Sequence, residues 1–141
     1  MKNDLEKEFF KGISHLKSKD PVFSKIQDEL GIIPFKLRKF NLSEFCGIII
    51  GQQLSSKAAN TIFLRLQDRL KPSKINAQSI LELKSEIFRE VGISSAKSRY
   101  IKNFASKVQR DSNFFDTLNN LTSEEAFQVL ILLDGVGPWS A

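Results

Sequence analysis

Apolar residues recur with a helical period along most of the chain, and no segment alternates convincingly as a strand does. The fold prediction depends most on the stretch Phe45–Leu66. It opens with an apolar run that has almost no polar face, which is typical of a helix at the centre of a domain. The run ends on Gly51, Gln52 and Gln53, which do not suit a core. We expect a buried helix, capped by Ser43, that carries two amides to the surface.

Further amphipathic segments flank this centre. The next helix, capped by Ser55 or Ser56, carries an apolar stripe as far as Leu70. We interpret Ile32–Asn41 as a connector, and the apolar pair Phe114-Phe115 as part of a loop. The pattern predicts an all-α fold of about seven or eight helices. The other expected helices are Leu5–Lys17, Pro21–Leu30, Ala77–Leu83, Ser85–Val91, a long helix starting at Ser94 or Ser95, and Ser123–Asp134.

Capping residues mark several boundaries of these helices. Ser, Thr, Asp and Asn favour the first position because their side chains accept from free backbone N–H groups, and glycine favours the last. The expected N-terminal caps are Asp20, Asn76 and Thr122, and the expected C-terminal glycines are Gly31 and Gly92.

Composition narrows the class of protein only slightly. The chain has 141 residues, 41% of them hydrophobic, which suits one domain over residues 1–141. Its 21 basic and 16 acidic residues give a net charge of +5, a mild preference for a polyanion. The single cysteine, Cys46, lies in the apolar run, so we expect a small buried hydrophobe and a reducing compartment. No segment approaches the roughly 20 apolar residues that span a bilayer, so we expect no membrane partner.

The C-terminal segment is typical of a helix-hairpin-helix motif at about residues 123–141. A helix is followed by Gly135-Val136-Gly137 and then by Pro138, which suits the first turn of a second helix. Free N–H groups at such a helix start favour an anion, for example a DNA phosphate. Taken alone, the pattern also fits a plain tight turn between two antiparallel helices.

Three segments together resemble a known family. They are GIIIGQQLSSKAANTIFLRL at 47–66, GISSAKSRYIKNFA at 92–105 and LLDGVGPWSA at 132–141. In this order and spacing they resemble the helix-hairpin-helix (HhH-GPD) DNA glycosylases, more narrowly the 3-methyladenine DNA glycosylase II branch. GISHLKSKDPVFSKI, at Gly12–Ile26, is also similar to the start of that family's helical domain.

The resemblance implies an enzyme of base excision repair. Such an enzyme hydrolyses the N-glycosidic bond of alkylated purines, such as 3-methyladenine, in double-stranded DNA after flipping the base from the stack. The position that matches the family's wedge, which fills the gap, is Gln53, beside Gln52. A glutamine can both intercalate and hydrogen-bond the widowed base. The alternative is that both glutamines merely end a helix at the surface.

The resemblance also assigns roles in the hairpin. The phosphate-binding positions are Gly135, Val136, Gly137 and Ser140. Trp139 matches an aromatic residue near the base pocket, where its indole suits a cationic purine, although ordinary core packing is the alternative. Glycosylases that also cut the strand have a lysine at this position, so tryptophan implies base removal only. The family implies no required cofactor, but carbonyls matching Ile131, Leu133 and Val136 can hold a structural Na⁺ or K⁺.

The resemblance breaks at the catalytic residue. The family's catalytic aspartate follows the second hairpin helix, beyond Ala141, and Asp134 lies on the wrong side of the hairpin to replace it. We therefore expect an incomplete glycosylase domain that lacks its C-terminal helices and releases no base by itself. The cysteines of the family's iron–sulfur variants also follow this region.

Two other classes remain open. One is a non-catalytic helix-hairpin-helix module that binds DNA through the hairpin and the basic helix Lys97–Arg110. The other is a helical protein-interaction domain with a solvated basic face. For the leading interpretation we expect a monomer in the cytoplasm, associated with the nucleoid in a bacterium.

Overall fold

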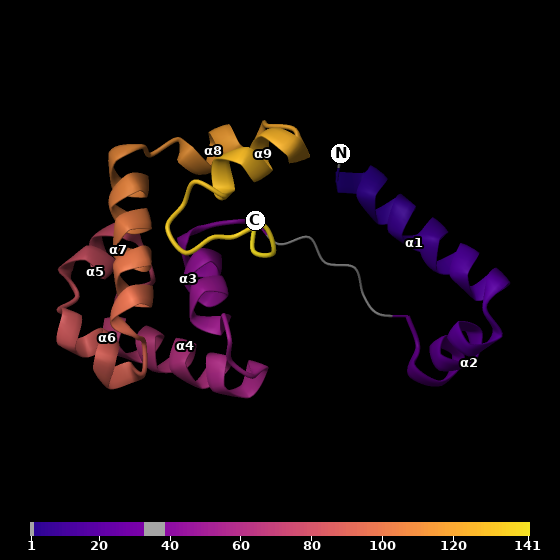
Figure 1. Cartoon of the computed structure of the whole chain (residues 1–141), viewed down its shortest axis with the longest axis horizontal. Coiled ribbons are helices and arrows are strands. Elements are labelled where there is room, and N and C mark those ends of the chain that lie inside the picture. The colour runs from indigo at the N-terminus through magenta and orange to yellow at the C-terminus, as the bar shows by residue number, and fades with distance from the viewer. Residues whose placement is uncertain (1, 33–38) are drawn as a thin grey trace. The chain divides into compact units, whose positions relative to one another are not determined.

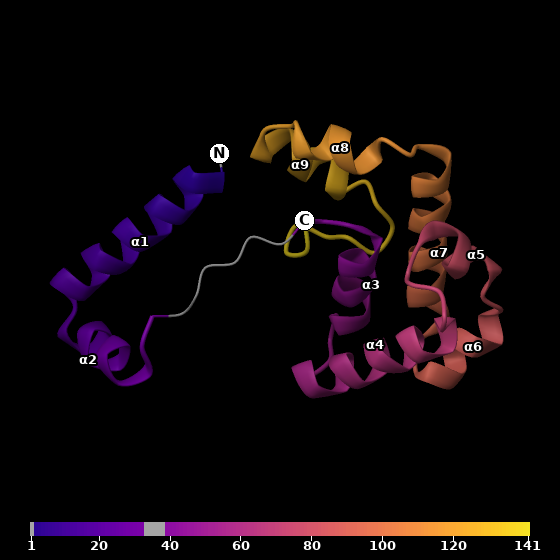
Figure 2. The same cartoon turned by 180° about the vertical axis from the view of Figure 1, so that it is seen from behind.

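The protein is helical throughout the residues that the structure describes. The structure is a computed structural model that describes residues 2–32 and 39–141, without the side chains of residues 2–4. Within these residues there are nine α-helices and no strand, which confirms the all-α prediction (Figures 1 and 2). The helices are α1 (Lys2–Lys19), α2 (Pro21–Leu30), α3 (Leu42–Gly51), α4 (Ser56–Leu70), α5 (Ala77–Glu82), α6 (Ser85–Val91), α7 (Ser95–Arg110), α8 (Phe114–Asn119) and α9 (Ser123–Leu130).

Backbone contacts divide the chain into two compact units, Met1–Lys39 and Phe40–Ala141. A single domain over residues 1–141 stays a prediction. Most of the connector expected over Ile32–Asn41 lies outside the described residues. None of the helices in the described stretches is long and apolar enough to cross a lipid bilayer.

The first unit is a pair of helices joined at a proline. The Asp20 carboxylate accepts from the backbone N–H groups of Val22 (2.8 Å) and Phe23 (3.1 Å), and Pro21 opens α2. Gly31 ends α2 with φ 76°. These boundaries follow the prediction, because an Asp-Pro start and a glycine end are both local signals. No residue of α2 is buried.

The second unit is built around α3. The side chains of Phe45, Cys46, Ile49 and Ile50 are at most 1% exposed. Helix α3 packs against α4 and α7, and α7 packs against α5 and α6 (Figures 1 and 2). The apolar run is therefore the central helix, as its lack of a polar face predicts. Its last turn contains the exposed Ile48 and leads directly into the turn that carries the two glutamines.

Most capping predictions are confirmed. Ser55, Asn76, Ser94 and Thr122 each accept a backbone N–H group at the start of α4, α5, α7 and α9. The prediction of Ser43 as the cap of α3 is wrong. Asn41 caps this helix by accepting from the Glu44 N–H group at 3.0 Å. The earlier start includes Leu42, which is 4% exposed, so burial of one more apolar residue accompanies the longer helix.

The prediction of a loop at the aromatic pair is also wrong. Phe114 and Phe115 open α8, and their rings pack edge to face at 5.5 Å between centroids. The ring of Phe104 meets those of Phe114 and Phe115 at 5.4 and 6.0 Å, also edge to face. Aromatic packing of this kind stabilises a short helix whose local sequence shows little periodicity.

Helix α9 is shorter than the predicted Ser123–Asp134. It ends at Leu130, after which the Leu133 N–H group donates to the Leu130 carbonyl at 3.0 Å in a tighter turn. In this segment Leu133 is 7% exposed, whereas Phe127, Leu130 and Ile131 are only partly buried. The early end leaves residues 131–140 as a chain of turns that can pack beside α3 and α7.

Burial of Cys46 generates a prediction about reactivity and pH. Desolvation raises the pKa of this thiol from 9.0 to about 12. We expect a thiol reagent to react slowly with the folded protein at pH 8 and rapidly after unfolding in urea. Above pH 9.0 the thiol ionises in the unfolded chain but not in the folded one, so the free energy of unfolding falls as the pH rises towards 12. Titration of Cys46→Ala provides the matched control, because this variant lacks that contribution. Full reaction of the native protein within the mixing time would contradict the prediction.

Candidate functional site

The end of α3, the start of α7 and the hairpin segment line one surface hollow of about 760 Å³. The segment after α9 runs between α3 and α7 (Figures 1 and 2). The hollow thus combines residues that are far apart in the sequence, all of them within the segments 47–66, 92–105 and 132–141. Its lining residues are Ile48, Gly51, Gln52, Gln53, Ser94, Ala96, Lys97, Tyr100, Trp139 and Ser140.

Gln52 joins the end of α3 to the hairpin. Its side-chain amide donates from Nε2 to the carbonyl oxygen of Gly135 at 2.7 Å. The hydroxyl oxygen of Ser140 lies 3.5 Å from the same nitrogen, at the limit of a hydrogen bond. The Gln52 side chain is partly buried, so the bond to Gly135 is shielded from competing water. Gln52 therefore holds the hairpin against α3.

Gln53 occupies the turn between α3 and α4 and is exposed. Its φ of 59° makes it the only non-glycine residue with positive φ in the described part of the chain. The Leu54 N–H group closes the turn by donating to the Gly51 carbonyl at 3.1 Å. A left-handed residue other than glycine costs about 1–2 kcal/mol and persists only where its surroundings impose it. The structure thus places the two adjacent glutamines differently, with Gln52 on the hairpin and Gln53 towards solvent.

Lys97 reaches from the first turn of α7 to the last turn of α3. Its ammonium donates to the carbonyl oxygens of Ile50 (2.8 Å) and Gln52 (2.7 Å). Burial lowers the pKa of Lys97 from its ordinary value. A cation at this place complements the free carbonyls and the negative end of the helix dipole of α3.

The two hairpin glycines have different surroundings. Gly135 has φ 78°, and a Cβ built on it would lie 2.3 Å from Cδ2 of Tyr100. Gly137 has no atom within 4 Å of its Cβ position and no positive φ. The N–H groups of both glycines donate no hydrogen bond within the described residues. Gly135 is thus required for packing, whereas Gly137 lies at an open surface.

The residues after Gly137 form a single turn. The N–H groups of Ser140 and Ala141 donate to the Gly137 carbonyl at 2.9 and 3.2 Å. Trp139 is 99% exposed and lines the hollow, so the core packing considered as its alternative is not observed. Its indole face is available to a planar ligand.

Asp134 lies outside the hollow. Its carboxylate accepts from the side-chain amide of Asn103 at 2.6 Å. Among the described residues that line the hollow, none is acidic. The described residues also contain no group of three or more His, Cys, Asp and Glu side chains that could bind a metal ion.

The outer face of α7 is basic. Arg99, Lys102 and Arg89 of α6 line a second hollow, of about 340 Å³, whose described lining contains no acidic residue. Lys102 and Arg99 also lie over the rings of Phe88 and Tyr100, each 5.6 Å from the ring centroid. This face provides a diffuse positive potential and no enclosed site.

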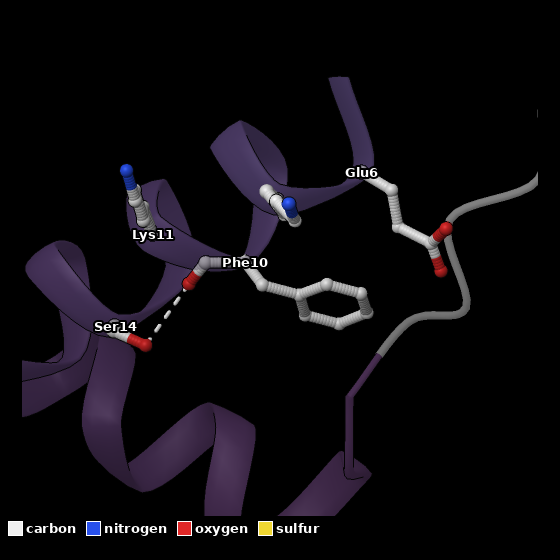
Figure 3. Close-up of a pocket in the computed structure, with 5 residues that line it drawn as sticks. Glu6, Phe10, Lys11 and Ser14 are labelled. Atoms are coloured by element: carbon white, nitrogen blue, oxygen red, sulfur yellow. Dashed lines mark hydrogen bonds between the residues drawn. The ribbon is translucent and has the colours of Figure 1, made fainter. Parts of the chain in front are cut away.

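A third hollow, of about 620 Å³, lies on α1 (Figure 3). Its described lining residues are Glu6, Lys7, Phe10, Lys11 and Ser14, all from that helix. The Ser14 hydroxyl donates to the Phe10 carbonyl at 2.9 Å, so it satisfies its own helix (Figure 3). No second described element closes this hollow, which we interpret as exposed helix surface.

Comparison with known proteins identifies the family. The HhH-GPD superfamily of base excision DNA repair proteins matches residues 46–136, from within α3 to the hairpin. The chain belongs to this superfamily. The match includes both glutamines, Lys97 and the first hairpin glycine. Among curated proteins, none matches the chain in sequence.

Three solved structures are similar to this chain in fold. A 3-methyladenine DNA glycosylase of Schizosaccharomyces pombe, in complex with abasic DNA, is 24% identical with a TM-score of 0.77. It aligns with 92% of this chain and 66% of its own. A DNA-3-methyladenine glycosidase of Bacillus halodurans (23%, TM-score 0.67) aligns with 89% of this chain and 57% of its own. A 3-methyladenine DNA glycosylase of Archaeoglobus fulgidus is 22% identical with a TM-score of 0.69. It aligns with 89% of this chain and 46% of its own. The chain thus spans about half to two-thirds of their length.

Sequence reasoning missed Tyr100 as a site residue, and it placed Lys97 only at the start of a basic helix. In the sequence Lys97 is one of several basic residues along the same helix. Only the structure shows that its ammonium bonds the backbone carbonyls at the end of α3. Tyr100 has no polar role, but its ring sets the space for Gly135. Their place in a segment shared with the HhH-GPD superfamily was the available signal.

The contact between Gly135 and Tyr100 predicts unequal effects of two alanine substitutions. We expect Gly135→Ala to lower the free energy of unfolding by about 2–4 kcal/mol, because it combines a positive φ with an overpacked ring. Gly137→Ala, the matched control, meets open space and should change it by less than about 0.5 kcal/mol. Urea denaturation measures both. Equal stabilities of the two variants would contradict the packing described for Gly135.

The left-handed turn predicts that glycine suits position 53 better than alanine. We expect Gln53→Gly to be more stable than Gln53→Ala by about 0.5–1 kcal/mol, since relief of the left-handed strain exceeds the entropy cost of glycine. The two midpoints of urea denaturation give this difference directly. A less stable glycine variant would show that residue 53 does not hold a positive φ in solution.

Proposed function

We propose that this chain forms the DNA-binding and base-recognition part of a monofunctional DNA glycosylase that excises alkylated purines such as 3-methyladenine. The observation that carries the proposal is the position of Gln53. It extends from a left-handed turn at the rim of a hollow that also contains an exposed indole and borders a glycine hairpin. These are the three elements that base flipping requires: a wedge, a base receptor and a grip on the backbone.

The hairpin would grip the phosphate backbone of double-stranded DNA. Free N–H groups of Gly135 and Gly137 precede a turn that starts like a helix, and such an arrangement favours an anion. Val136 lies between the two glycines, and the hydroxyl of Ser140, three residues after Gly137, can donate to the same phosphate. Contacts of this kind fix the register of the protein on DNA and carry no sequence preference.

Gln53 would fill the gap left by the flipped base. Its side chain is exposed and ends in an amide that both donates and accepts hydrogen bonds. It can therefore pair with whichever base is left without a partner. Gln52 cannot do so without giving up its bond to Gly135.

Trp139 would receive the flipped base. A purine methylated at N3 carries a positive charge, which is attracted to the electron-rich indole face. A hollow of about 760 Å³ offers ample space for one base beside this ring. Lys97 lines the same hollow, but its ammonium is already bonded to two carbonyls and is a poor candidate for Schiff-base chemistry.

Hydrolysis also needs a carboxylate near the sugar, to stabilise the positive charge of the transition state. No described lining residue supplies one, and Asp134 is bonded to Asn103 away from the hollow. We expect the chain alone to release no base, because no described residue that lines the hollow can take this role. The missing carboxylate equally favours the second candidate function, a DNA-binding module without chemistry.

We propose that the hairpin holds a monovalent cation. The carbonyls of Ile131, Leu133 and Val136 lie within six residues after α9, and only that of Leu133 already accepts a bond, from the Val136 N–H group at 3.0 Å. Carbonyl oxygens are suitable ligands for Na⁺ or K⁺. Such an ion would add positive charge beside the phosphate that the hairpin binds.

Binding to an abasic duplex tests the proposal. We expect the chain to bind a duplex with a tetrahydrofuran abasic analogue at least about tenfold more tightly than the same undamaged duplex, and Gln53→Ala to remove most of this preference. Gln109→Ala makes the same change at an exposed position of α7 and should keep it. Fluorescence anisotropy gives each affinity.

The outcomes separate the candidate functions. Salt-dependent binding with equal affinity for both duplexes would favour the DNA-binding module. No binding at low salt would reject both, and would favour the protein-interaction domain. Base release from alkylated DNA by this chain alone would refute the expectation that the described hollow is insufficient for hydrolysis.

A further inference from the structure

Lys97 contacts the backbone that presents Gln53. One of its two acceptors, the Gln52 carbonyl, belongs to the same peptide group as the Gln53 nitrogen. The other, the Ile50 carbonyl, lies in the last turn of α3. The two bonds, at 2.7 and 2.8 Å, therefore fix the orientation of the peptide plane on the N-terminal side of the left-handed residue.

The turn needs such an external restraint. Gln53 has φ 59°, a conformation that a non-glycine residue leaves unless its surroundings hold it. The bond from Leu54 to Gly51 closes the turn, but a closed turn of this length is compatible with several backbone conformations. The Lys97 ammonium distinguishes among them, because both carbonyls must face it.

Gln52 is held a second time, through its side chain. The Gln52 amide donates to the Gly135 carbonyl, while the Gln52 carbonyl accepts from Lys97. A continuous chain of hydrogen bonds thus runs from α7 through the α3–α4 turn to the hairpin. Within it, Lys97 is the only charged member, and charged donors form the stronger hydrogen bonds.

We propose that Lys97 is a positioning residue: it fixes the peptide group between Gln52 and Gln53, so that Gln53 meets DNA already in the conformation that enters the base stack. This inference rests on the proposed function of Gln53 as the wedge. A turn that is ordered in advance does not have to lose conformational freedom on binding. The resulting gain in affinity appears only in complexes where the wedge enters the base stack. Lys97 thus acts on the preference for damaged DNA more than on general DNA affinity.

A direct contact between Lys97 and a DNA phosphate would behave differently. Loss of such a contact would weaken binding to damaged and undamaged duplexes alike, and would lower the slope of log K against log salt concentration by about one unit. The positioning role predicts an unchanged salt slope and a loss of affinity for the damaged duplex only. The two roles are therefore separable with the same set of variants.

The test compares Lys97→Met with Lys102→Met, which makes the same change elsewhere on α7. The readouts are affinity for the abasic and undamaged duplexes over a range of salt concentrations, and fluorescence of 2-aminopurine placed opposite the abasic analogue. We expect Lys97→Met to lower the abasic preference at least about fivefold, towards that of Gln53→Ala, with the salt slope unchanged. The 2-aminopurine signal that accompanies wedge insertion should be lost with it. Lys102→Met should keep the preference and the signal.

Lys97→Arg keeps the charge and serves if the methionine variant does not fold. The guanidinium carries its donors further from the backbone than an ammonium does and holds them in one plane, so it meets the two carbonyls with a different geometry. We expect Lys97→Arg to retain affinity for the undamaged duplex and to lose most of the abasic preference. An arginine variant that loses affinity for the abasic and the undamaged duplex alike would overturn the proposal. Thermal unfolding confirms that each variant is folded before its affinity is interpreted.

A double-mutant cycle examines whether Lys97 acts through Gln53. If it does, Gln53→Ala should reduce the abasic preference strongly in the wild-type protein and hardly at all in Lys97→Met. Independent, multiplicative losses would overturn the proposal. A wild-type chain with no abasic preference would instead reject the proposed function, whereas retention of the preference in Lys97→Met would reject only the role of Lys97.

Discussion

The carbonyl end of the buried helix α3 is the constraint on which the site depends. A helix leaves its last carbonyl groups without partners, and groups at the end of a buried helix need bonds from elsewhere in the fold. Here Lys97 supplies those bonds from α7. The need to satisfy the end of α3 thus brings the start of α7 to the turn that carries the two glutamines. Stability and presentation of the turn have the same physical cause.

Two contacts of Gly135 hold the hairpin beside the turn that carries the two glutamines. Gly135 allows the chain to turn against the Tyr100 ring, and its carbonyl then meets the Gln52 amide. Gly137, two residues later, faces open space. One glycine therefore sets the packing of the hairpin and the other leaves a backbone surface accessible to a ligand. The same short motif thus contributes one glycine to the packing of the fold and another, two residues later, to the candidate interface.

Local signals in the sequence predicted the boundaries of most helices, because caps such as Asp20, Asn76 and Thr122 act within a few residues. Helix α8 was missed because its stability comes from Phe104, ten residues before Phe114. The residues around the site were recognised by their resemblance to the HhH-GPD superfamily. No local pattern encodes the tertiary contacts that place Gln52 and Gln53 differently. The same holds for the bonds from Lys97 to the end of α3.

The most direct test of the account is a crystal structure of the chain bound to a duplex with an abasic analogue. The account predicts that Gln53 lies in the gap of the base stack, that Lys97 still bonds the Ile50 and Gln52 carbonyls, and that the N–H groups of the hairpin face a phosphate. DNA bound along the outer face of α7, with Gln53 in solvent, would contradict it.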